Sequence, residues 1–147
     1  MMEVVIFVGI QGSGKSTFYK ERFVDTHIRG NLDMLKTRHR EQCLVNACIV
    51  AKQAFVVDNT NPARDDRSRY IEPAKAAGFK IIGYYFPPDI EVCQWRNENR
   101  PERQVVPLKG LLGTCSRLER PCQDEGFDEL YSVQIGADGG FVVEALP

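Results

Sequence analysis

A glycine-rich loop near the N-terminus is the sequence feature that most constrains this chain. It follows a short apolar segment, residues 3–8, and leads directly into a helical pattern over residues 15–23. The loop matches GxxxxGK[ST] in full and reads Gly9-Ile10-Gln11-Gly12-Ser13-Gly14-Lys15-Ser16. A strand, a phosphate-binding loop and a helix in this order predict a nucleotide-binding α/β fold.

The residue types in the loop explain how it would hold a triphosphate. Glycines let backbone N–H groups converge on phosphate oxygens, and the positive end of the helix dipole points at the same place. Lys15 is expected to reach the β- and γ-phosphates of ATP, and the Ser16 hydroxyl to ligate Mg²⁺. The predicted ATP site in this segment comprises Gly9, Gln11, Gly12, Ser13, Gly14, Lys15, Ser16 and Thr17. A chance glycine-rich turn is the alternative.

Strand and helix patterns alternate along the rest of the chain. Strands are predicted over residues 26–29, 54–57, 79–86, 127–135 and 141–144, and helices over residues 34–53, 62–77, 89–99 and 107–118. On the helix over residues 34–53, the predicted buried face consists of Leu44, Ala47, Cys48 and Ala51. The alternation predicts a mostly parallel central sheet flanked by helices. Together with the GxxxxGK[ST] loop, it predicts a three-layer P-loop NTPase fold.

Length and composition fit one globular domain over residues 1–147. Hydrophobic residues make up 43% of the chain and charged residues 27%, and the net charge of −1 offers no global field for a long polyanion. The sequence has no secretory signal and no run as long as a membrane span, so we expect a cytoplasmic protein without membrane contact. The cysteines form no CxxC pair, which fits a reducing compartment, and no obligate protein partner is indicated.

Two carboxylates are expected at the edge of the sheet that carries the loop, because ligands of open α/β sheets lie outside the carboxyl ends of the strands. Asp33 could accept the proton of an attacking hydroxyl, or it could cap the following helix. Asp58 ends a buried apolar strand and could hold Mg²⁺ through water, or it could only shape the turn. Both alternatives stay open for both residues.

A small arginine-bearing lid is predicted before and within the proline-flanked loop at residues 101–106. Arg96, Arg100 and Arg103 could close over the triphosphate and neutralise charge in the transition state, whereas a solvated surface is the alternative. Trp95 and Tyr70 could stack on a base, but core packing is the default expectation for each. No residue pattern marks an adenine pocket.

Several segments together resemble the P-loop kinases related to the kinase domain of polynucleotide kinase 3′-phosphatase. Besides the loop, they are Asn31-x-Asp33 with Leu35, Val56-Val57-Asp58-Asn59-Thr60-Asn61-Pro62, Arg69-Tyr70-Ile71 and Ala74-Lys75-Ala76-Ala77-Gly78. The resemblance implies that Asp33 is the general base, that Lys15 and Ser16 serve phosphate and Mg²⁺, and that the lid arginines clamp ATP. It also implies that the acceptor is the 5′-hydroxyl of DNA or RNA.

The resulting hypothesis is an ATP-dependent kinase in which Lys15, Asp33, Arg96 and Arg100 are catalytic and Ser16 and Asp58 hold the metal. Its cofactors would be ATP and Mg²⁺, and its acceptor a 5′-hydroxyl polynucleotide or oligonucleotide. Two alternatives remain: a kinase of the same fold that acts on a small hydroxylated metabolite, and a nucleotide-binding module without turnover.

Overall fold

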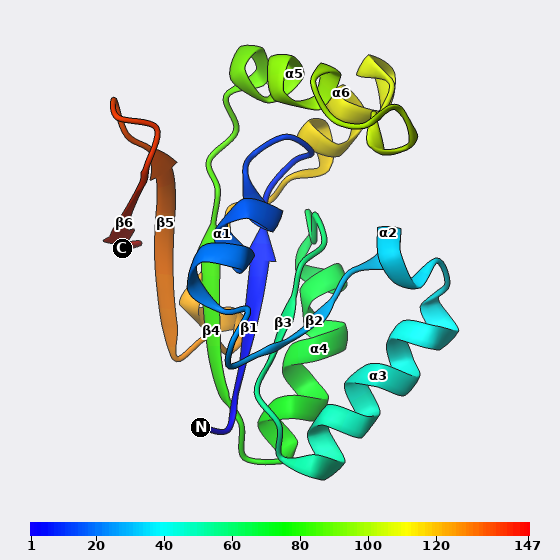
Figure 1. The fold of residues 1–147 in the computed structure, drawn as a ribbon. Coiled ribbons are helices and arrows are strands. Elements are labelled where there is room, and N and C mark those ends of the chain that lie inside the picture. Colours follow the sequence, from blue (N-terminus) through cyan, green and yellow to red (C-terminus); the bar gives the residue numbers. More distant parts are fainter.

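The computed structural model describes all 147 residues as one α/β structure in three layers (Figure 1). The strands are β1 (Glu3–Val8), β2 (Ile28–Gly30), β3 (Phe55–Val57), β4 (Lys80–Tyr85), β5 (Glu129–Ile135) and β6 (Phe141–Ala145). The α-helices are α1 (Lys15–Arg22), α2 (Leu32–Leu35), α3 (Arg38–Ala51), α4 (Arg64–Ala76), α5 (Ile90–Glu98) and α6 (Leu108–Arg117). Two 3₁₀ turns, η1 (Glu102–Gln104) and η2 (Gln123–Glu125), complete the chain. The predicted fold class is confirmed.

All six strands form one sheet in the order β2-β3-β1-β4-β5-β6. The pairs from β2 to β5 are parallel, and β6 returns antiparallel to β5 as the predicted hairpin. The chain builds the β2–β3 side of β1 first and then crosses to β4 on its other side, so the strand order reverses at β1. A crevice is expected at the carboxyl end of a strand where the order reverses, and the glycine-rich loop begins there.

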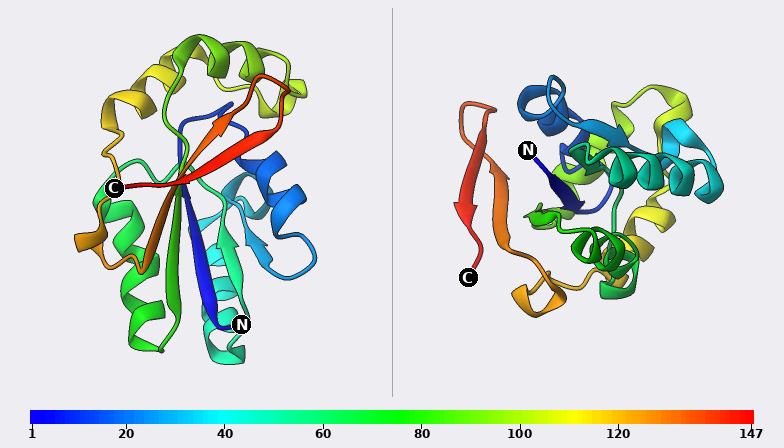
Figure 2. Two further views of the ribbon diagram at one scale, coloured as in Figure 1. Left: turned by 90° about the vertical axis from the view of Figure 1, so that its left-hand side faces the viewer. Right: turned by 90° about the horizontal axis from the view of Figure 1, so that it is seen from below.

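The two faces of β1 fix the three layers because successive side chains of a strand point to opposite faces. Val4, Ile6 and Val8 are fully buried in the cluster that contains α3 and α4, and Val5 and Phe7 are fully buried in the cluster that contains α1. The helices therefore lie on opposite sides of the sheet (Figure 2), while α5 and α6 lie beyond its carboxyl edge at the top of Figure 1. None of the helices combines the length and the apolarity that crossing a membrane requires.

The helix predicted over residues 34–53 is two helices, α2 and α3. Asn31 caps α2 by accepting a hydrogen bond from the backbone N–H of Met34, and Thr37 caps α3 by accepting one from Arg40. Between them, Lys36 has φ 76°, a conformation that no helix contains. Asp33 therefore lies inside α2 and does not cap a helix, which removes the alternative role considered for it.

The predicted buried face of α3 is partly wrong. Its buried residues are Glu41, Val45 and Cys48, whereas Ala47 and Ala51 are exposed. The buried face of α3 differs from the predicted one because it includes the Glu41 carboxylate, which is hydrogen-bonded inside the protein. The prediction considered only apolar side chains and therefore did not include Glu41.

The lid, residues 90–117 with α5 and α6, is attached to the sheet before its first residue and to helix α4 after its last. Before the lid, the Phe86 N–H donates to the Val8 carbonyl at 2.8 Å. After it, fully buried Arg67 of α4 donates to both carboxylate oxygens of Glu125, at 2.7 and 3.0 Å. The Arg67 guanidinium also donates to the carbonyls of Asn61 and Pro62, at 2.9 and 3.0 Å, so this buried ion pair has the additional hydrogen bonds that make its burial favourable.

Candidate active site

The glycine-rich loop joins β1 to α1 and folds around its own lysine. The Lys15 ammonium donates to the carbonyls of Gly9 and Ile10 at 2.9 and 2.8 Å and to the Ser13 hydroxyl at 3.3 Å. Burial lowers the pKa of Lys15 from 10.5 to about 8, and the nearby Asp58 carboxylate opposes this change. The lysine is thus a buried charge in the nucleotide-free loop, and phosphate oxygens would be favourable partners for it.

Two glycines of the loop occupy positions that a side chain could not share. Gly12 and Gly14 have φ values of 78° and 94°. A Cβ on Gly12 would lie 2.2 Å from the Cys93 carbonyl oxygen of α5, and one on Gly14 would lie 2.6 Å from a guanidinium nitrogen of Arg96. The lid therefore rests directly on the loop, at two positions where only glycine fits.

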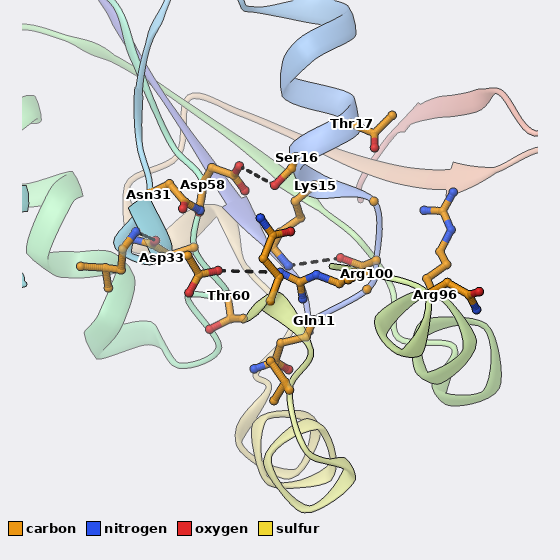
Figure 3. Close-up of a pocket in the computed structure, with 18 of the residues that line it drawn as sticks. Gln11, Lys15, Ser16, Thr17, Asn31, Asp33, Asp58, Thr60, Arg96 and Arg100 are labelled. Atoms are coloured by element: carbon orange, nitrogen blue, oxygen red, sulfur yellow. Dashed lines mark hydrogen bonds and ion pairs between the residues drawn. The ribbon is translucent and has the colours of Figure 1, made fainter. Parts of the chain in front are cut away.

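Ser16 and Asp58 meet at the end of β3, as predicted. The Ser16 hydroxyl donates to the Asp58 carboxylate at 3.1 Å (Figure 3), and the Asp58 side chain is only 1% exposed. These oxygens are the hard ligands that Mg²⁺ takes, so the residues present fit this cation.

Sequence reasoning missed a third member of this group, Arg29 of β2. Its Nε donates to the Asp58 carboxylate at 2.8 Å and its terminal nitrogen donates to the Ser16 hydroxyl at 2.8 Å. Arg29 also lies over the Tyr19 ring, 5.7 Å from the ring centroid. The sequence around Arg29 gives no indication of this role, because its partners, Ser16 and Asp58, lie far away along the chain. It balances the charge of the buried Asp58 carboxylate in the nucleotide-free protein.

Asp33 faces the loop from the opposite wall of the same cleft. Its side chain is 77% exposed, and its carboxylate lies 3.8 Å from the Arg100 guanidinium, which extends from the end of the lid helix α5 (Figure 3). Lys15, Ser16, Asp33, Asp58, Arg96 and Arg100 all line this cleft, which has a volume of about 510 Å³. The structure thus brings together every residue that was predicted to be catalytic or to hold the metal.

Hydrogen bonds from the segment after β3 position α2 and hence Asp33. The Asn31 amide donates to the Asp58 carbonyl at 2.6 Å, and the Asn59 side-chain oxygen accepts from the Leu32 N–H at 2.9 Å. Both asparagines belong to segments that carry the family resemblance, and these bonds give them a structural role. The general-base candidate is therefore attached to the same loop as the metal candidate.

Buried Glu41 holds Asn59 in turn. The Glu41 carboxylate accepts a hydrogen bond from the Asn59 amide at 2.7 Å and one from the Tyr70 hydroxyl at 2.6 Å. Burial, followed by the bond to Glu41, raises the pKa of Tyr70 to about 12. Tyr70 is buried as expected, but its hydroxyl serves this network, which sequence reasoning did not identify.

The remaining predicted residues differ in where they point. Arg96 lies by Gly14 and extends away from Asp33 (Figure 3), and Arg103 does not line the cleft. The Gln11 side chain turns toward α6 and donates to the Thr114 hydroxyl at 3.1 Å, so only its backbone faces the position of a phosphate. Trp95 corrects an expectation: it is 64% exposed at the cleft and does not pack in the core.

Known proteins share both sequence and fold with this chain. Residues 31–121 match the AAA domain family, AAA_33. A bifunctional polynucleotide phosphatase/kinase of Schizosaccharomyces pombe (strain 972 / ATCC 24843) is 29% identical over 137 residues, which cover 89% of this chain and 33% of that protein. The chain thus spans 33% of the length of this curated relative.

Two solved structures with low sequence identity share the fold. Kti12 of Chaetomium thermophilum, in complex with ADP-AlF3, has a TM-score of 0.64 at 16% identity, over 89% of this chain and 88% of that chain. A gluconokinase from Sinorhizobium meliloti 1021 has a TM-score of 0.61 at 16% identity, over 90% of this chain and 82% of that chain. The family match extends over more than half of the chain, which therefore belongs to the AAA domain family and has the fold of the P-loop kinases.

Proposed function

We propose that this chain is an ATP-dependent phosphotransferase whose acceptor is the 5′-hydroxyl end of a polynucleotide or oligonucleotide. The observation that carries the proposal is the cleft itself, in which the loop lysine and the exposed Asp33 carboxylate lie on facing walls with Arg100 reaching from the lid. Phosphoryl transfer requires a phosphate cradle, cations and a carboxylate near the incoming hydroxyl. We infer that residues 1–147 act as one kinase unit.

In the proposed reaction, each group has one role. The loop amides and Lys15 hold the β- and γ-phosphates, and Ser16 and Asp58 would hold Mg²⁺, which neutralises phosphate charge when bound. Asp33 accepts the proton of the acceptor hydroxyl as its oxygen bonds to the γ-phosphorus and the bond to the bridging oxygen of ADP breaks. Arg96 and Arg100 balance the charge that spreads over the transferring group.

The nucleic-acid acceptor is supported by two lines of argument. The segments from Asn31 to Pro62 resemble those of the polynucleotide kinases, and the matching relative from Schizosaccharomyces pombe carries polynucleotide kinase in its name. The side chain of Asp33 is open to solvent, so a chain end could reach it without a buried acceptor pocket. A small hydroxylated metabolite in the same cleft is the alternative that the experiment must separate.

The test is transfer from γ-labelled ATP, with Mg²⁺, to single-stranded oligonucleotides that carry a 5′-hydroxyl. The expected result is labelled product with wild-type protein, none with a 5′-phosphorylated oligonucleotide, and a loss of about 100-fold or more for Lys15→Ala and Asp33→Asn. Asp25→Asn is the matched control, because Asp25 is an exposed carboxylate away from the cleft. Transfer to polyols or sugars but not to oligonucleotides would replace the proposed acceptor with a metabolite.

A further inference from the structure

The single tryptophan of the chain lies exposed at the cleft. Trp95 belongs to α5, its side chain is 64% exposed, and it is the only aromatic residue among the large exposed hydrophobic residues. An indole ring carries more apolar surface than any other side chain, and leaving it in water forgoes burial energy. A fold that keeps this one ring outside the core, in the wall of its main cleft, leaves a flat apolar surface for a ligand.

The surroundings of the ring indicate which kind of ligand would use it. The cleft is lined mostly by polar residues, and Leu32 and Val106 are its only other hydrophobic residues. Lys20 of α1 and Arg96 of α5 line the same cleft. An aromatic surface beside cations is the combination that binds nucleic acid components, because bases stack on the ring while the cations pair with phosphates.

The position of Trp95 on α5 places it next to the phosphate site. Trp95 lines the same cleft as the loop residues Gly12 to Lys15, and Arg96, the next residue of α5, approaches Gly14. Asn99, one turn further, also lines the cleft and donates through its amide to the Trp95 carbonyl at 2.7 Å, which leaves its side-chain oxygen as an acceptor. That oxygen could receive an exocyclic amino group of a base.

We propose that Trp95 is a stacking surface for a nucleobase whose phosphates are held in the cleft. The inference rests on the proposed function and refines it, because it assigns a base, and not a sugar or polyol, to this wall of the site. The base is supplied either by ATP or by a nucleotide of the acceptor strand. The two sources share one chemistry, and the ligands chosen below distinguish them.

Fluorescence excited at the red edge of tryptophan absorption provides a direct test, because the five tyrosines are not excited there and Trp95 is the only tryptophan. Wild-type protein is titrated separately with ATP, with inorganic triphosphate, with a 5′-hydroxyl oligonucleotide and with an abasic strand of equal length. Quenching by ATP but not by triphosphate assigns the base of ATP. Quenching by the oligonucleotide but not by the abasic strand assigns a base of the acceptor. Equal responses to the members of both pairs, or no response to any ligand, would overturn the proposal.

Three substitutions separate stacking from simple apolar contact. Trp95→Ala and Trp95→Leu are expected to weaken binding of the base-bearing ligand by about 5- to 150-fold, measured by calorimetry, while Trp95→Phe retains most of the affinity. Because the side chain is exposed, all three variants should melt near the wild-type temperature. Equal affinity of the Leu and Phe variants would count against stacking.

The outcomes for this inference and for the proposed function are independent. Base-dependent quenching in a protein that transfers no phosphate would support Trp95 as a base-binding residue and contradict the proposed kinase reaction. Phosphate transfer to oligonucleotides by Trp95→Leu, with wild-type affinity for ATP and for the oligonucleotide, would keep the reaction and remove the role of Trp95.

Discussion

The buried lysine of the phosphate loop predicts that ATP affinity depends on pH in a specific window. In the nucleotide-free protein, burial places the pKa of Lys15 at about 8 instead of 10.5. The difference corresponds to roughly 3 kcal/mol that disfavours the charged form. In the nucleotide-free loop the ammonium donates only to neutral oxygens. Bound phosphates would supply anionic partners and return the pKa to its ordinary range or above, so ATP binding should take up a proton wherever the free lysine is neutral.

The expected magnitude follows from these values. Near pH 7 the free lysine is largely charged and ATP affinity should change little, and by pH 8 about half of it is neutral. Above pH 8 the dissociation constant should rise about tenfold for each pH unit until about pH 10.5. The γ-phosphate of ATP does not interfere, because its second pKa lies near 6 and it is fully ionised throughout this window.

The lowered pKa of Lys15 should also make the stability of the nucleotide-free protein depend on pH. The unfolded chain, with a lysine pKa of 10.5, binds more protons than the folded chain between pH 8 and 10.5, so the free energy of unfolding contributed by Lys15 should rise through this range. The cost of the buried charge is fully present below pH 8.

Calorimetry in two buffers of different ionisation enthalpy, at pH 8.5 to 9, measures the proton uptake directly. We expect close to one proton per ATP for the wild type and none for Lys15→Met, whose weaker binding should also be independent of pH. A wild-type dissociation constant that stays constant from pH 7 to 9.5 would refute the assignment of the buried charge.

Three further substitutions test the packing of the site. Gly12→Ala should abolish ATP binding and lower the melting temperature, because the added Cβ meets a backbone carbonyl at 2.2 Å, whereas Gly113→Ala in open space should be neutral or slightly stabilising. Arg29→Met should destabilise the metal-free protein by about 3 kcal/mol, because it leaves the buried Asp58 unpaired, and Mg²⁺ should recover part of this loss. Identical melting of wild type and variant in EDTA would contradict that reading. Glu41→Gln should lower turnover with little change in ATP affinity, because it disturbs the segment that positions α2; an unchanged turnover number would count against this positioning role.

Much of the fold follows from periodicity and from one motif. The apolar runs at residues 3–8 and 79–86 are strands because both faces of a parallel sheet are covered, and the loop between the first strand and the first helix fixes where a ligand must lie. The break between α2 and α3 was not predicted. Lys36 has φ 76°, and Thr37 directly after it caps a new helix, so the continuous helical pattern of the sequence covers two helices.

Site residues could be predicted from the sequence where their position after a strand places them at the edge of the sheet. They could not be predicted where their role depends on contacts with residues far away in the chain. Asp58 directly follows β3, and Lys15 begins the helix that the glycine-rich loop joins to β1, so the edge of the sheet brings them together. Arg29 and Glu41 are charged residues on a strand and a helix, and only the packed structure supplies the carboxylate and the amide that they meet. Trp95 was assigned to the core by default, but α5 covers the cleft and not the sheet.

The two attachments of the lid limit how it can move. Its first end continues from the sheet at Phe86, and its last end returns to the buried pair of Arg67 and Glu125. A segment secured at both ends behaves as a strap: it can bow or tighten over the loop, but it cannot swing free like a flap with one hinge. Any movement of the lid must therefore take place between these attachments, and Arg96 and Arg100, four residues apart in the chain, must travel together.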